Sequence, residues 1–338
     1  MRTFLVLQIG EAARRALAPG QVARVLAVFS RTFYCEGEDR ALVCIGPPGI
    51  GAGPLNAIGL LPDGLEWSTL GLCPGAPAST DGRTLRVSGQ FLFDLTSARP
   101  WRPEPLPHPI DGWLLTAGLA ALATALAAGP RPDGLGPLIA PLAAMSADLP
   151  PDLPGASRLV RAAWRGVRPL TDWLDIVLRD PAGPAPPPPA EVEGLIGLGP
   201  GLTPSGDDFL GGTLIALHAL GAHAAACRLG PWVLARASDR THRISLGHLA
   251  CAAEGEGAGA LHGALAAICS PGSAGLGRCL ETLGGIGHSS GWDALAGVVA
   301  ATRSLAVGSR GPGGVRLATE PPGRIRAGRL SPRRRAAS

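Results

Sequence analysis

The chain has 338 residues, of which 46% are hydrophobic and 17% charged, enough apolar sequence to bury a sizeable core. Its 30 basic residues are all arginine and give a net charge of +4, but residues 309–338 hold eight of them and one glutamate, so the rest of the chain carries about −3. That negative body argues against a nucleic-acid-binding domain, and the longest apolar stretch, residues 113–128, is too short for a membrane span.

Cysteine usage and the start of the chain predict a cytoplasmic protein. The seven cysteines are scattered and form no C-x-x-C pair, which argues against a disulfide framework or a structural zinc site. The opening apolar run, residues 3–7, is too short for a signal peptide, and charged residues follow from Glu11 onward. We expect no nucleic acid and no membrane among its partners.

The first hundred residues predict a β-rich unit. Short runs of Val, Leu and Phe, cut by Gly and Pro, predict strands within residues 22–33, 41–45 and 85–93. Residues 46–54 hold four glycines and three prolines and predict a loop. Residues 100–109 hold five prolines and predict an extended connector that leaves this unit.

From residue 111 onward the apolar residues recur at helical spacing. Asp111 and Ser157 stand where helix caps are expected, and residues 181–190 (PAGPAPPPPA) predict a stiff spacer. The expected helices cover residues 111–128, 135–148, 157–179, 208–220, 232–236, 244–253, 258–268, 277–283 and 292–305.

These patterns predict an α+β fold in three parts. Residues 1–108 form the β-rich N-terminal unit, and residues 109–308 form a larger helical unit that contains the spacer and a glycine-rich loop at 197–208. Residues 309–338 are dominated by Gly, Pro and Arg and predict a disordered basic tail.

The most informative stretch is the glycine-rich loop, residues 197–210, which reads GLGPGLTPSGDDFL. Thr203 and Ser205 are both placed as N-caps of the following helix, and Asp207 and Asp208 lie in its first turn. A capped helix needs one hydroxyl and one acid. It does not need four glycines, two prolines, a further hydroxyl and a second acid, so we interpret the loop as a ligand site.

A second segment repeats the pattern about 85 residues later. The residues that begin at Ser290 match those that begin at Ser205 as S-G-x-D-x-L-x-G, with Asp293 in the place of Asp208. One interpretation is chance recurrence in a chain rich in Gly and Ala. The other is that two helix N-termini converge on one small polar ligand.

Several ligands fit these residues. No G-x-x-x-x-G-K-[ST] motif is present, which excludes a P-loop. Asp207 and Asp208 suit either a divalent cation such as magnesium or an N–H donor on the substrate, although nothing in the sequence demands a cofactor. Arg240 or Arg243 could hold an anionic end, and His288 is the histidine best placed for a site.

The chain resembles the AllH-like family at these residues. The resemblance lies in GLGPGLTPSGDDFLGG, in the T-x-x-x-S block from Thr241 to Ser245, in GHSSGWDALAG and in residues 29–54. It implies a subunit of an oxamate carbamoyltransferase, which converts oxalurate and phosphate to oxamate and carbamoyl phosphate in allantoin and purine catabolism. It also implies other carbamoyltransferase subunits as partners and a small anionic substrate.

We expect Asp207, Asp208, Asp293 and His288 to serve catalysis, with Asp207 and Asp208 as the candidate metal ligands. The expected substrate-binding residues are Gly199, Gly201, Thr203, Ser205, Gly206, Arg243, Ser245 and Ser290. Two alternatives stay open: a non-catalytic structural or ligand-binding subunit of such a complex, and a small amide- or carboxylate-binding protein of an unrelated pathway.

Overall fold

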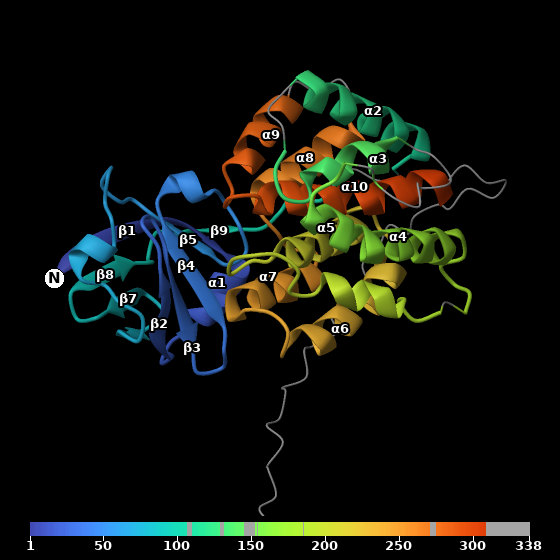
Figure 1. Cartoon of the computed structure of the whole chain (residues 1–338). Coiled ribbons are helices and arrows are strands. Elements are labelled where there is room, and N and C mark those ends of the chain that lie inside the picture. Colours follow the sequence, from blue (N-terminus) through green and yellow to red (C-terminus); the bar gives the residue numbers. More distant parts are fainter. Residues whose placement is uncertain are drawn as a thin grey trace, which may run out of the picture.

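The computed structural model describes residues 1–106, 110–128, 132–144, 153, 155–184, 186–270 and 275–308. A β-barrel lies on one side of the molecule and a helical unit on the other (Figure 1). This arrangement confirms the α+β fold, with the β-rich unit first and the larger helical unit second. The expected basic tail, residues 309–338, lies outside the described residues.

Eight strands close the barrel, and a ninth extends it. They are β1 (Arg2–Gly10), β2 (Val22–Val28), β3 (Phe33–Gly37), β4 (Leu42–Gly46), β5 (Asn56–Gly59), β6 (Pro77–Thr80), β7 (Thr84–Val87), β8 (Phe91–Asp94) and β9 (Arg99–Trp101). The order is β5-β4-β3-β2-β6-β7-β8-β1, with β5 also paired to β1 and β9 added beside β1. Strand β1 closes the ring because its first half runs parallel to β8 and its second half antiparallel to β5.

Aromatic side chains fill the barrel. Trp67, which follows β5, is fully buried, and its ring lies 4.8 Å from that of Phe33 and 5.5 Å from that of Phe91. Phe4 and Phe93 complete the cluster. Inward side chains therefore alternate with outward ones along β3, where Phe33 and Cys35 point into the core while Tyr34 and Glu36 face outward toward the helices.

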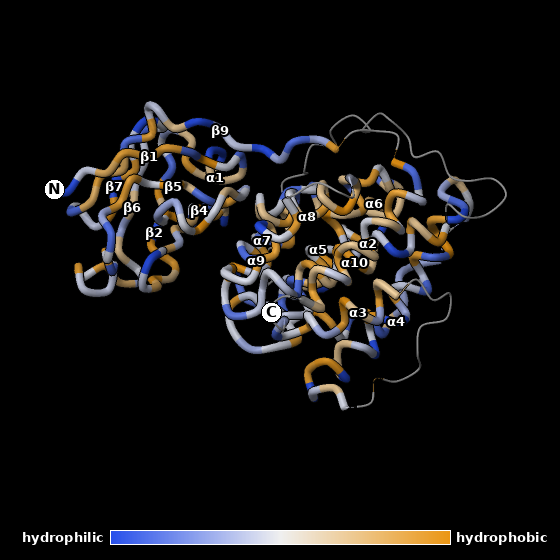
Figure 2. Tube along the Cα trace, turned by 90° about the horizontal axis from the view of Figure 1, so that it is seen from above, coloured by the Kyte–Doolittle hydropathy of each residue, from blue (hydrophilic) through white to orange (hydrophobic). Residues whose placement is uncertain are grey.

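Helices account for most of the second unit. They are α2 (Gly112–Ala128), α3 (Ile139–Ala143), α4 (Arg158–Arg179), α5 (Ser205–Ala219), α6 (His223–Ala237), α7 (Arg243–Ala253), α8 (Gly259–Cys269), α9 (Leu276–Gly284) and α10 (Ser290–Gly308), while α1 (Glu11–Ala16) belongs to the barrel. Helices α5 and α10 lie in the middle of this unit with the others around them (Figures 1 and 2). Their side chains are buried on nearly all sides, as expected of a central helix pair.

Several expected boundaries need correction. Residues 85–93 form two strands, because a turn at Ser88 and Gly89 separates β7 from β8. Residues 135–144 form a short 3-10 turn and the five-residue α3, and the remainder of the helix expected at 135–148 lies outside the described residues. Helix α6 begins at His223, nine residues before the helix expected at 232–236.

Both expected helix caps are confirmed. Ser157 caps α4 by accepting a hydrogen bond from the Val160 N–H at 3.2 Å, and Asp111 accepts one from the Trp113 N–H at 2.9 Å. The described residues of the spacer at 181–190 form no helix or strand before Ala190. All seven cysteines are free thiols. Within the described ranges, no helix combines the length and the apolar character that a membrane crossing requires.

The barrel meets the helical unit at α7. Arg243 at the start of α7 donates to the Glu36 carboxylate on β3 over 2.6 Å. A Cβ on Gly247 would lie 2.6 Å from Leu42 on β4, so this turn of α7 lies directly on the outer face of the barrel. The start of α8 adds a further contact, because the Gly259 N–H donates to the Ala52 carbonyl at 2.7 Å.

Candidate active site at the N-termini of α5 and α10

The glycine-rich loop before α5 follows a backbone path that requires glycine. Gly197, Gly199 and Gly201 have φ angles of +73°, +117° and +91°, values in the left-handed region that other residues rarely adopt. A Cβ on Gly206 would lie 2.0 Å from the carbonyl oxygen of Leu195. The first turn of α5 therefore lies directly against the chain that precedes the loop.

The expected side-chain cap of α5 is absent. Its N-cap is Pro204, whose carbonyl accepts hydrogen bonds from the N–H groups of Asp207 and Asp208 at 2.9 and 3.1 Å. The expectation that Thr203 or Ser205 caps this helix is wrong, because loop carbonyls already accept from its first N–H groups. The Thr203 hydroxyl instead lies 3.0 Å from that of Ser290, on the other repeat.

Asp207 fastens the loop and α7 to α5. Its buried carboxylate accepts a hydrogen bond from the Gly197 N–H at 2.8 Å through Oδ1. Its Oδ2 accepts from the Ser245 hydroxyl at 2.7 Å and from the Thr241 hydroxyl. The T-x-x-x-S block noted in the sequence thus supplies two donors to this one acid, and both carboxylate oxygens are engaged by the protein.

Asp208 differs, because its Oδ2 is buried and has no hydrogen-bond partner among the described residues. Burial raises the pKa of this carboxyl well above its usual value, and the nearby Asp293 and Asp207 carboxylates raise it further. The Ser290 hydroxyl acts in the opposite direction by interacting with the carboxylate. A buried acceptor without a donor is costly, so this atom points to a group that binds from outside the chain.

Tyr34, the single tyrosine of the chain, brings the barrel to this site. Its hydroxyl lies 3.2 Å from Nε2 of His248 on α7. Burial raises the pKa of Tyr34, and Cys44 and the Asp208 carboxylate add to the rise. Burial also lowers the pKa of His248 to about 4 and raises that of Cys44 to about 12. At neutral pH these three groups are therefore uncharged.

The N-terminus of α10 lies against that of α5. Asp293 is buried, and its Oδ1 accepts a hydrogen bond from the Leu135 N–H at 2.5 Å while its Oδ2 accepts from the Ser289 hydroxyl at 2.8 Å. Burial raises the pKa of this carboxyl, and these hydrogen bonds, with an interaction from Ser205, oppose the rise. The structure therefore brings together the two repeated segments found in the sequence.

The two remaining expected site residues, Arg243 and His288, make no hydrogen bond to Asp208 within the described part of the chain. Arg243 is held by the barrel, since its guanidinium donates to Glu36 and to the Arg40 carbonyl. Arg240, the other arginine considered for an anion, pairs with Glu193 at 3.3 Å. His288 is exposed on the loop before α10.

No metal centre is apparent in the part of the chain that the structure describes. There, no group of three or more His, Cys, Asp or Glu side chains is arranged to hold an ion. Asp207 and Asp208 are neighbours in the first turn of α5, but both Asp207 oxygens already accept hydrogen bonds from the chain. Asp208 is thus the acid of the pair that has an oxygen free for a ligand.

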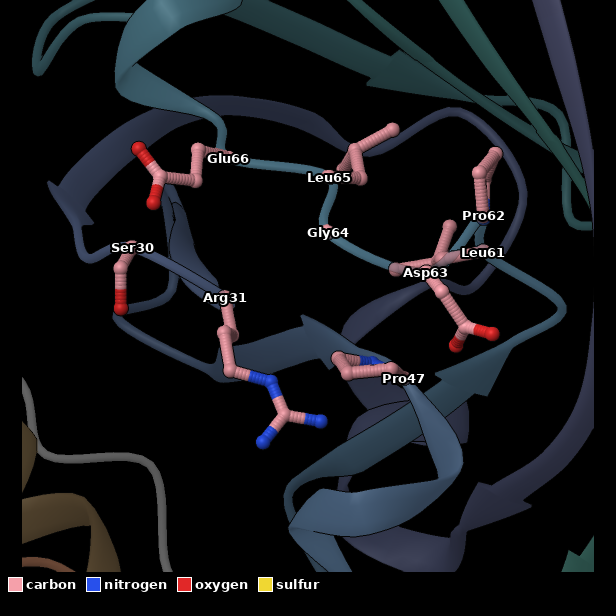
Figure 3. A pocket seen from close by; sticks show the side chains of 9 residues that line it. All are labelled: Ser30, Arg31, Pro47, Leu61, Pro62, Asp63, Gly64, Leu65 and Glu66. Atoms are coloured by element: carbon pink, nitrogen blue, oxygen red, sulfur yellow. The ribbon is translucent and has the colours of Figure 1, made fainter.

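The barrel carries a separate cavity of about 230 Å³ beside the loop that follows β4 (Figure 3). Arg31, Asp63 and Glu66 supply its charged groups. The Arg31 guanidinium lies close to Gly49, where a Cβ would be 2.9 Å from Nη2. Arg31 forms no ion pair within the described residues, and it stands three residues before Tyr34.

Sequence reasoning missed Tyr34, Cys44 and His248. The first two lie within residues 29–54, a segment in which the sequence predicts no site residue. The uniqueness of the tyrosine was the available signal. His248 lies on α7 three residues after Ser245, on the turn that follows the T-x-x-x-S block.

The comparisons with known proteins agree with this location. The family model described as oxamate carbamoyltransferase subunit AllH matches residues 195–302. The matched segment begins just before the glycine-rich loop and ends within α10, so it contains Asp207, Asp208, Ser245, His248 and Asp293. No curated protein and no solved structure matches the chain. The match shows that residues 195–302, about a third of the chain, are similar to that family.

Proposed function

We propose, starting from the similarity of residues 195–302 to oxamate carbamoyltransferase subunit AllH, that this chain is the substrate-binding subunit of such a transferase. The reaction would be carbamoyl transfer between oxalurate and phosphate, giving oxamate and carbamoyl phosphate. The observation that carries the proposal is the buried, unpartnered Oδ2 of Asp208, which lies where α5, α10 and the barrel meet.

This reaction depends more on the positioning of the two substrates than on covalent catalysis by the protein. A phosphate oxygen attacks the ureido carbonyl carbon of oxalurate, the bond from that carbon to the internal nitrogen breaks, and the nitrogen leaves as the amide of oxamate after taking a proton. Two anions must be held against each other, and charge develops on the carbonyl oxygen. The positive ends of the helix dipoles at the N-termini of α5 and α10 would favour the negative charge of both substrates and of the transition state.

Each side of the site would have its own role. Asp208 would accept an N–H of the carbamoyl group. Tyr34 stays protonated at neutral pH, so its hydroxyl can donate to an oxygen of the ligand whenever His248 Nε2 carries a proton and donates to the phenol oxygen.

Purification with neighbouring gene products, followed by assay of carbamoyl phosphate formation from oxalurate and phosphate, tests the proposal. We expect a complex with sister transferase subunits, and we expect Asp208→Asn to lower its activity about 100-fold without dissociating it. Asp239→Asn is the matched control, because Asp239 is exposed on the turn after α6. A fully active Asp208→Asn complex would instead indicate a structural subunit, with the chemistry on a sister chain.

A further inference from the structure

The two repeated segments make reciprocal contacts on each other. A Cβ on Gly212 of α5 would lie 1.9 Å from the Ala294 carbonyl oxygen of α10. A Cβ on Gly297 of α10 would lie 1.9 Å from the Phe209 carbonyl oxygen of α5. Gly212 corresponds to Gly297 and Phe209 to Ala294 in the repeat, so each helix makes the same contact on the other.

The equivalence extends into the loops that precede the helices. Cβ atoms on Gly206 and Gly291 would each lie 2.0 Å from a carbonyl oxygen, that of Leu195 and that of Leu283 respectively. The same two carbonyls accept hydrogen bonds from the N–H groups three residues later, at 3.1 and 3.0 Å. The repeat therefore begins at Leu195 and Leu283, and the first loop is longer by three residues, 200–202.

The hydroxyls and acids cross between the helices in the same way. The Ser290 hydroxyl of α10 interacts with Asp208 of α5, and the Ser205 hydroxyl of α5 interacts with Asp293 of α10. Both acids lie in the first turn of a central helix, beside the serine that begins the other. Their surroundings are thus equivalent on the side where the helices meet.

They differ on the opposite side. The Asp293 carboxylate accepts the backbone N–H of Leu135 at 2.5 Å. The turn that presents this N–H comes close because Gly134 has a φ of +60° and no side chain, and a Cβ there would lie 2.3 Å from Asp293 Oδ1. At Asp208 no described backbone N–H takes the corresponding role, and Oδ2 is buried without a donor.

We propose that the peptide N–H of Leu135 at Asp293 marks the position of a ligand at Asp208, and that Asp208 selects compounds with an amide or ureido N–H. The chain's own backbone amide fills one of two equivalent sites, and the other is left for a molecule of the same chemistry. Asp293 is in this view a structural counterpart of the ligand site. The inference rests on the proposed function only for the size and charge of the ligand, a small amide acid.

Discrimination between isosteric acids tests this. Oxamate and oxalate differ in one group, an NH₂ in oxamate and a carboxylate O⁻ in oxalate, and Asp208 in its ionised form should accept a hydrogen bond from the first and repel the second. Binding to the full chain, alone and in its complex, is measured by calorimetry with both acids, and N-carbamoylglycine and succinate serve as a longer pair.

We expect the N–H acid of each pair to bind at least tenfold more tightly than its dicarboxylate. Asp208→Asn should reduce this ratio by tenfold or more, because an amide side chain can donate to oxalate, and Asp239→Asn should leave it unchanged. Equal binding of both acids, a ratio unaffected by Asp208→Asn, binding that requires magnesium, or no binding of either N–H acid would each overturn the inference. An intact ratio with no carbamoyl phosphate formed would sink the proposed transferase function alone.

Discussion

The unequal surroundings of Asp208 and Asp293 predict opposite effects of the same isosteric substitution. In Asp293→Asn the new amide cannot accept both the Leu135 N–H and the Ser289 hydroxyl through carboxylate oxygens. One buried donor loses its acceptor, and a charge-assisted hydrogen bond is lost. Together these cost about 3 kcal/mol of unfolding free energy, which corresponds to a fall in Tm of about 6–12 °C for a unit of this size.

Asp208→Asn should cost little stability, because Oδ2 has no donor to lose. The pKa of Asp208 is raised in the folded protein, so ionisation favours the unfolded chain, and stability falls as the pH rises from the unfolded pKa through the folded one. Asparagine removes that loss. We expect an unchanged or higher Tm at pH 7, and a smaller gain at pH 4.

Thermal melts of the two variants and the parent chain, followed by circular dichroism at both pH values, measure the contrast. Asp239→Asn again provides the baseline for an exposed acid. If Asp208→Asn lowered the Tm as much as Asp293→Asn does, Asp208 would have a protein partner and the argument for an open ligand position would fail.

Three further predictions concern the parts that build the site. Tyr34→Phe should lower the activity of the complex at least tenfold while costing about 1 kcal/mol of stability, the value of its hydrogen bond to His248, and an active variant would remove the phenol from the mechanism. Gly297→Ala should destabilise by about 3 kcal/mol or more, since its Cβ would lie 1.9 Å from a backbone oxygen of α5, and a wild-type urea midpoint would contradict the close packing of the helices. Arg243→Met should destabilise the chain at pH 7 and much less at pH 3. Arg243 and Arg24 lower the pKa of Glu36 against the effect of burial. The ion pair therefore stabilises the fold above the unfolded pKa of Glu36, and this stabilisation is lost as the pH falls through the folded pKa. An equal loss at both pH values would show that packing, not charge, matters there.

The features of the site that depend on residues close together in the chain could be predicted from the sequence. The spacing S-G-x-D-x-L-x-G, which occurs at Ser205 and at Ser290, predicts two helices that begin in the same way. A helix repeats its contacts every few residues and needs glycine wherever another backbone approaches closely. The glycines at positive φ before α5 carry the same kind of information. Strands β5, β6 and β9, with three or four residues each, are too short to show a period of two, and they were not predicted.

Pairings between distant segments could not be read in this way. The contact of Tyr34 with His248 spans 214 positions, and that of Leu135 with Asp293 spans 158. Nothing in the local sequence distinguishes Asp207, which accepts hydrogen bonds from Thr241 and Ser245, from Asp208, whose Oδ2 has no donor. The difference arises from which face of the first turn of α5 meets α7, and only the tertiary packing decides that.

The seam of the barrel has a consequence for how the protein is made. Strand β1 is held between β5 and β8, so the ring cannot close until Asp94 has emerged from the ribosome, and the pairing joins segments far apart in the chain. Such long-range closure is slow compared with helix formation. The outer face around Leu42 and Leu55, which packs beside Cys251 of α7 in the finished structure, then stays uncovered until α7 has been synthesised. The nascent barrel must therefore remain in solution with this apolar surface exposed while about 160 further residues are synthesised. A chaperone would be expected to act at that surface.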